Sequence, residues 1–229
     1  MPAEGRVRID LAEAPGRYAD GSAYLLSRPA YTVTDAAFGP LEADILLAPR
    51  IAPALLGLGL LEAVDAAVIR AAADPDDRDR DGISGRAADL GGGRLGRFGW
   101  KATQPSVRDQ VALAFLEDIG ITSDLHREPN CPPPQRACAA APDGGRPELD
   151  SAKLDQVTFY CQTLGVPARR RLDGSAEAAG EGLFGALGCA ACHSASVTDF
   201  SRCSSKCAPT IPPVRMSGSL SPFTSLTMT

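Results

Sequence analysis

The chain has 229 residues, 44% of them apolar and 5% aromatic, and a formal net charge of −5. This length fits one or two domains, and the acidic balance gives no reason to expect a nucleic acid or an anionic membrane as a partner. The longest apolar stretch, residues 52–61, is interrupted by Pro53, Gly57 and Gly59, so no membrane span is predicted. The 23 glycines and 19 prolines predict much irregular structure.

The first 75 residues predict short β segments followed by a helix. The strand-like segments are residues 7–10, 23–26 and 31–33. The turn signals between and after them are Pro15-Gly16, Asp20-Gly21 and Gly39-Pro40. A helix is expected from near Leu60 to Ala73, where Pro75 ends the pattern.

Three more helices are predicted from apolar residues at helical spacing. The clearest begins after Ser106, a good N-cap, and runs to about Ile119. After an irregular segment at 122–149, a second runs over 150–164 and is expected to bury Leu154, Val157, Cys161 and Leu164. A third, over 175–187, carries Gly180, Leu183, Phe184 and Leu187 on one stripe.

The run Cys189-Ala190-Ala191-Cys192-His193 is a C-x-x-C-H motif, the attachment site of c-type haem. Two thiols at this spacing can form thioethers with the vinyl groups of one porphyrin, and His193 can then supply an imidazole to the iron. A helix with a small residue and an aromatic directly before the motif suits packing against a flat apolar macrocycle. The motif therefore predicts haem c as the cofactor.

Other interpretations of the same cysteines stay open on these residues. Cys203 and Cys207 follow closely, so four thiolates could hold one zinc ion. A redox C-x-x-C pair or a plain disulfide is also conceivable, although the βαβ context of a redox pair is absent. Elsewhere, Cys131 and Cys138 predict a disulfide that closes a short loop.

Two further candidate sites stand outside the motif. Asp77, Asp79 and Asp81 precede Gly82 in a D-x-D-x-D-G pattern that could bind Ca²⁺, although a surface Asp-Gly turn explains it equally well. Trp100, the only tryptophan, is either a partly buried aromatic near a domain seam or an electron relay beside haem.

Several blocks in a fixed order resemble the di-haem oxidoreductase family, often labelled thiol oxidoreductase, which is similar to bacterial di-haem cytochrome c peroxidases and to MauG. The blocks are residues 49–53, 57–63, 81–86, 96–102, 118–123, 166–170 and 189–193. The resemblance implies a mainly α fold. Residues 1–149 would form an inter-haem region with irregular short β segments, an acidic loop and helices, and residues 150–229 an incomplete cytochrome c-like haem domain.

The departures from the family pattern predict a partial chain. Such proteins carry two C-x-x-C-H sites and an export signal, whereas this sequence has one site and no signal. Ile119 also stands where the family has methionine, and the match fades after about Ser194. We therefore expect the N-terminal haem domain to be missing, the piece to be inactive alone, and Cys203 and Cys207 to belong to no designed site.

The resemblance implies a periplasmic c-type haem oxidoreductase that transfers electrons and performs di-haem peroxidase-type chemistry. A second haem is expected in the full-length protein, with peroxide as substrate and a small redox protein as electron donor or acceptor. Trp100 would relay electrons between the haems, and Asp77, Asp79 and Asp81 would bind Ca²⁺ near that path. The alternatives are a non-catalytic electron-transfer cytochrome c and a zinc-binding module with four cysteine ligands.

Overall fold

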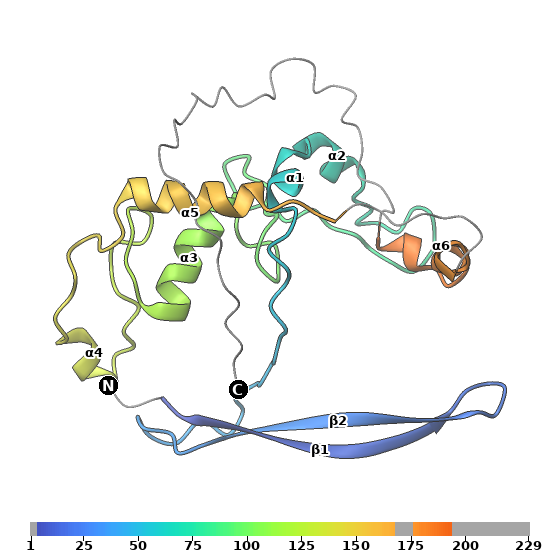
Figure 1. Cartoon of the computed structure of the whole chain (residues 1–229), viewed down its shortest axis with the longest axis horizontal. Coiled ribbons are helices and arrows are strands. Elements are labelled where there is room, and N and C mark those ends of the chain that lie inside the picture. The colour runs from blue at the N-terminus through green and yellow to red at the C-terminus, as the bar shows by residue number, and fades with distance from the viewer. Residues whose placement is uncertain (1–3, 168–175, 194–229) are drawn as a thin grey trace, which may run out of the picture.

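The computed structural model describes residues 4–167 and 176–193, in which six α-helices and one two-stranded sheet are formed (Figure 1). Helices α1, α3 and α5 pack together into one body, and a β-hairpin lies apart from them along one side. These helices and strands agree with the expectation of a mainly α chain with β segments at its N-terminal end.

The hairpin consists of β1 (Arg6–Arg17) and β2 (Ala23–Thr34), paired antiparallel along their whole length. The three expected segments all lie inside these two longer strands. The turn expected at Asp20-Gly21 is confirmed, since Ser22 donates its backbone N–H to Asp20 at 2.9 Å and Gly21 has a φ of 85°.

The turn expected at Pro15-Gly16 is wrong, because both residues continue β1 and pair with Leu25 and Tyr24. Proline is tolerated there because each strand of a two-stranded sheet has one unpaired edge. A Cβ at Gly16 would lie 2.3 Å from the Tyr24 ring, so a larger residue there would have to displace that side chain. The local turn signal is therefore overridden by cross-strand packing.

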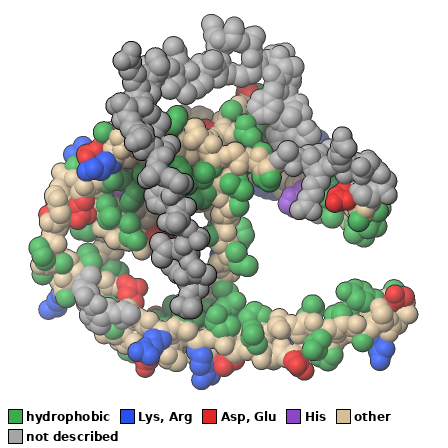
Figure 2. Space-filling view, in the orientation of Figure 1, with side chains coloured by type: hydrophobic (Ala, Val, Ile, Leu, Met, Phe, Trp, Pro, Cys, Tyr) green, Lys and Arg blue, Asp and Glu red, His purple; other side chains and the backbone are tan. Residues whose placement is uncertain are grey.

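The hairpin leaves much apolar surface uncovered among the described residues. Val7, Ile9 and Leu11 alternate along β1, and each is more than half exposed. In Figure 2 hydrophobic side chains lie mainly on the side of the hairpin turned toward the helices, with charged side chains mainly on the opposite side.

The single helix expected over residues 60–73 is wrong in its middle, where two short helices meet. α1 spans Leu58–Ala63 and α2 spans Ala66–Ala71. Between them the backbone of Val64 and Asp65 is extended, and the Asp65 carboxylate accepts a hydrogen bond from the Ala67 N–H at 2.7 Å. Aspartate favours such a cap over a helix interior, so its side chain starts a new helix instead of continuing the old one.

The two long helices are confirmed, together with the predicted cap at Ser106. α3 spans Val107–Ile119, with Ser106 accepting from the Asp109 N–H at 3.0 Å and Gly120 at a φ of 72° ending it. α5 spans Ser151–Thr163 and is capped by Asp150. Their contact forms the core, whose buried hydrophobic members are Phe98, Val107, Val111, Ala112, Leu149, Leu154 and Cys161.

The expected apolar stripe of α5 is confirmed at two positions and modified at two. Leu154 and Cys161 are buried, Val157 packs partly against the core, and Leu164 lies past the helix end and is half-buried. Burial raises the pKa of the Cys161 thiol, which agrees with its interpretation as an inert core residue.

The segment between α3 and α5 is tied at both ends. Glu148 accepts hydrogen bonds from the Gly144 N–H at 2.9 Å and the Thr122 N–H at 3.1 Å, and these bonds lower its pKa. The segment also contains the short helix α4 (Arg136–Ala139), which the sequence did not predict.

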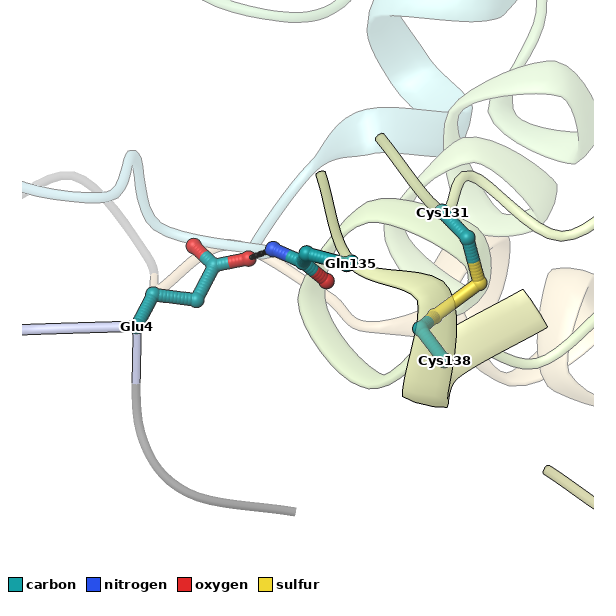
Figure 3. Close-up of a disulfide and its surroundings, with 4 residues drawn as sticks. All are labelled: Glu4, Cys131, Gln135 and Cys138. Carbon is teal, nitrogen blue, oxygen red and sulfur yellow. Dashed lines mark hydrogen bonds between the residues drawn. A yellow bond between two sulfur atoms is a disulfide. The ribbon is translucent and has the colours of Figure 1, made fainter. Parts of the chain in front are cut away.

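The predicted disulfide between Cys131 and Cys138 is present and closes the turn that leads into α4 (Figure 3). Within that turn Gln135 is buried and donates its side-chain amide to the carboxylate of Glu4, at the base of the hairpin. The loop closed by the disulfide thus contacts the start of the hairpin.

Candidate functional site

The C-x-x-C-H motif forms one compact turn at the end of a helix. α6 spans Ala176–Ala186, Gly188 reverses the backbone with a φ of 75°, and a 3₁₀ turn, η1, covers Cys189–Ala191. The backbone N–H groups of Cys192 and His193 both donate to the carbonyl oxygen of Cys189, at 3.3 and 3.0 Å. These hydrogen bonds close the backbone of the motif into one turn.

The thiols of the motif are free and accessible. Cys189 is half-buried, Cys192 is exposed, and neither is in a disulfide. In the part of the chain that the structure describes, neither belongs to a group of three or more potential metal ligands. The other two cysteines of the zinc hypothesis, Cys203 and Cys207, lie outside the described residues.

The helix before the motif presents an uncovered apolar surface. Leu183 is 57% exposed and Leu187 is 74% exposed, although large aliphatic side chains normally avoid water. Among the described elements, α6 packs only against η1. An uncovered apolar helix that ends in two free thiols and an imidazole fits a macrocycle with a flat apolar face, so the residues present suit a c-type haem.

The candidate calcium residues are brought together as predicted. One carboxylate oxygen from each of Asp77, Asp79 and Asp81 lies within 4.8 Å of the others. The same carboxylates also accept backbone hydrogen bonds within the loop, from the N–H groups of Gly82, Asp81 and Ile83 respectively. The cluster can therefore serve either as a cation site or as the internal support of an exposed turn.

Trp100 lies on a tight turn that follows the buried Phe98. It is 57% exposed, and the guanidinium carbon of Arg50 lies 5.8 Å from its ring centroid, which is a cation–π distance. The expectation of a partly buried aromatic is therefore met only in part.

Two charged residues that the sequence analysis did not single out connect several elements. Arg97 donates to three backbone carbonyls at the end of α1, and Glu62 joins α1 to α3 and α5. Both lie inside the blocks that carry the family resemblance, which was the available signal for them. Neither residue type in isolation indicates such a role.

The motif, its turn and the apolar helix before it define a haem-binding redox protein. A family model described as "Di-haem oxidoreductase, putative peroxidase" matches residues 16–228. The chain belongs to this family, and its general function is haem-dependent oxidation and reduction. No curated protein and no solved structure shows significant similarity to the chain.

None of the helices in the described part of the chain has the length and apolar character that a membrane span requires.

Proposed function

We propose that this chain carries a covalently bound haem c and forms part of a peroxidase-type enzyme that uses two haems. The observation that supports this most is the backbone turn formed by the C-x-x-C-H motif, in which the N–H groups of Cys192 and His193 both donate to the Cys189 carbonyl directly after an uncovered apolar helix. Residues 150–229 would form the cytochrome c-like haem domain, and residues 1–149 the region between the two haems. The second haem would come from the full-length protein, and this piece would be inactive without it.

Each residue of the motif has a distinct role in this proposal. The thiols of Cys189 and Cys192 fix the porphyrin covalently, and the His193 imidazole ligates the iron. Leu183 of α6 and Leu187, which follows it, would supply apolar surface beside the ring. When bound, the haem would supply an iron that exchanges electrons and, where an axial position is open, binds peroxide.

Trp100 would act as the electron relay between the two haems. Its exposed indole would then be covered by another part of the full-length protein. A small redox protein would supply or accept the electrons at the surface. Because covalent haem attachment in bacteria takes place outside the cytoplasm, we place the full-length protein in the periplasm.

The haem content of the exported chain tests this proposal directly. The chain is produced with an export signal in a host competent for cytochrome c maturation, and the pyridine haemochrome spectrum of the denatured protein is recorded. We expect a c-type α-band at one haem per chain. Stoichiometric zinc without haem would instead favour the module with four cysteine ligands.

The alternative of a non-catalytic electron-transfer cytochrome makes a different prediction for the full-length protein. Both axial positions of each haem would then be filled, and the iron would be six-coordinate and low-spin. A peroxidase-type protein has one haem with an open position, which adds a high-spin signal. Electron paramagnetic resonance of the oxidised protein separates the two, and peroxide-dependent oxidation of a reduced cytochrome would confirm turnover.

Calcium binding by Asp77, Asp79 and Asp81 is the second part of the proposal. If the three carboxylates share one ion, Ca²⁺ at 100 times its Kd should raise the free energy of unfolding by about 2.7 kcal/mol. The Asp79→Asn variant should lose most of this effect. Calorimetric titration and thermal unfolding with and without Ca²⁺ measure it.

Asp76→Asn is the matched control for this measurement. Asp76 lies in the same acidic loop, but its side chain is 76% exposed and it is not a member of the cluster. The cluster would be only a surface turn if Ca²⁺ stabilised the two variants equally. The same conclusion would follow if the unchanged chain showed no heat of Ca²⁺ binding.

A further inference from the structure

The two faces of the β-hairpin differ in character, and neither is covered by another described element. One face carries Val7, Ile9 and Leu11 of β1, and the other carries Arg8 and Asp10, which form an ion pair at 2.9 Å. Within the described part of the chain, no helix and no third strand contacts the hairpin, which lies apart from the helices (Figure 1). A two-stranded sheet without packing partners is only marginally stable in water, which argues for a partner outside these elements.

The backbone groups at the odd-numbered positions of β1 point to its free edge. The Tyr18 N–H donates to the Ser22 carbonyl at 2.9 Å, and these two residues continue the register of the hairpin, so its even-numbered pairs are the hydrogen-bonded ones. Pro15 and Pro29 agree with this, because both belong to odd-numbered pairs, where the ladder needs no N–H. The odd-numbered residues of β1 therefore direct their N–H and C=O groups away from β2.

The free edges of the two strands are not equally open to pairing. Pro29 lies in the middle of β2 at an outward-facing position and offers no N–H, which is a common protection of an edge strand. On β1, no proline interrupts the outward-facing positions from Val7 to Glu13. An edge of this kind is a template for a further strand, so β1 is the edge that can accept a partner.

Strand β1 is complementary to a second copy of itself in one antiparallel register. When Ile9 lies opposite Ile9 of the second copy, Arg8 of each copy faces Asp10 of the other. On the opposite face, Val7 of each copy then faces Leu11 of the other, and both of these side chains are more than half exposed in the single chain. Opposite charges and apolar side chains at facing positions both stabilise an antiparallel pair.

The neighbouring registers are disfavoured by charge. Because outward-facing groups must meet one another, the alternatives closest to this register are centred on Arg8 or on Asp10. The first places two arginines opposite each other, and the second places two aspartates opposite each other. Like charges at facing positions destabilise a strand pair, so the charge pattern selects the register centred on Ile9.

We propose that two copies of this chain associate through the free edges of their β1 strands, in the antiparallel register centred on Ile9. The two hairpins then form one four-stranded sheet with a continuous apolar face. Arg8 and Asp10 keep their ion pair within each copy and gain a partner of opposite charge across the interface. This inference goes beyond the proposed function and does not depend on haem.

Sedimentation velocity of the full chain over a range of concentrations tests the inference, with a non-reducing gel to exclude dimers linked through free thiols. Ile9→Pro removes an outward N–H from β1 but no hydrogen bond to β2, and should raise the dissociation constant of the dimer about tenfold. Ser27→Pro is the matched control, because it removes an outward N–H from the edge of β2. We expect this control to leave the dissociation constant unchanged.

Charge reversal tests the register and leaves the backbone intact, so it also decides the question if Ile9→Pro does not fold. Arg8→Asp and Asp10→Arg should each weaken self-association about tenfold, because like charges then face each other across the interface. An equimolar mixture of these two variants should associate as tightly as the unchanged chain, since every charge in one variant faces the opposite charge in the other.

Three outcomes would overturn the inference. They are a chain that stays monomeric at every concentration, equal weakening by Ile9→Pro and Ser27→Pro, and a mixture of the charge variants that associates no better than either alone. Amide hydrogen exchange then identifies the edge. With rising concentration, exchange should slow at the N–H groups of Val7, Ile9 and Leu11, and slowing at Ser27 and Tyr31 instead would also contradict the proposed interface.

Discussion

Replacing Cys189 and Cys192 together with alanine should abolish covalent haem attachment. Both thioether bonds depend on these thiols, and no other described pair of free cysteines has their spacing. Cys192 is exposed and Cys189 is half-buried, so their loss leaves the core intact. The haem that stays with the polypeptide after acidic organic extraction should fall to background, while the far-ultraviolet circular dichroism of the chain is preserved.

The matched control replaces Cys131 and Cys138, the pair joined by the disulfide. This variant removes the same number of cysteines from the same chain, but it should retain haem at the level of the unchanged protein. Haem that remains bound to the variant without Cys189 and Cys192 would contradict the proposed attachment site. Loss of haem from both variants would point to a general failure of export or folding.

Gly59→Ala should destabilise the body formed by α1, α3 and α5. Alanine gains about 1 kcal/mol over glycine in a helix interior. Its Cβ, however, would lie 2.2 Å from the backbone oxygen of Gln162, which cannot rotate away. Overpacking of this kind costs about 3 kcal/mol. The net expectation is a loss of about 2 kcal/mol, measured by urea unfolding.

Gly165→Ala is the comparison for that measurement. Gly165 lies just past the end of α5, its φ is not in the left-handed region, and nothing lies within 4 Å of a Cβ built there. Its substitution should change the free energy of unfolding by less than about 1 kcal/mol. If Gly59→Ala were equally harmless, the close approach of α1 and α5 would not be a feature of the folded chain.

Local signals in the sequence determined the elements whose ends are marked by capping side chains. Ser106 and Asp150 define the starts of α3 and α5, and the structure confirms both. The disulfide between Cys131 and Cys138 was also predictable, because two cysteines so close in the chain need little ordering to meet. The C-x-x-C-H motif, together with the ordered blocks, was enough to identify the family.

Local signals misled where a second interaction outweighed them, from the partner strand in one case and from a nearby capping side chain in the other. Pro15-Gly16 reads as a turn, but pairing with β2 keeps it extended. The pattern over residues 60–73 reads as one helix, but the Asp65 side chain caps a second one. In both places the sequence pattern is compatible with two backbone conformations, and the hydrogen bonds that form decide which one is adopted.

The sequence by itself thus determined the family, which implies haem as the cofactor, and the two main helices, because each is encoded by residues close together in the chain. Only the tertiary structure decided how these parts are joined. Arg97 reaches a carbonyl 36 residues away, and Glu62 meets Gln162 across 100 residues. Charged side chains of this kind are normally solvated, so their residue types alone do not distinguish them. Their partners are set by the packing of α1 against α3 and α5, which brings distant backbone and side-chain groups within hydrogen-bond distance.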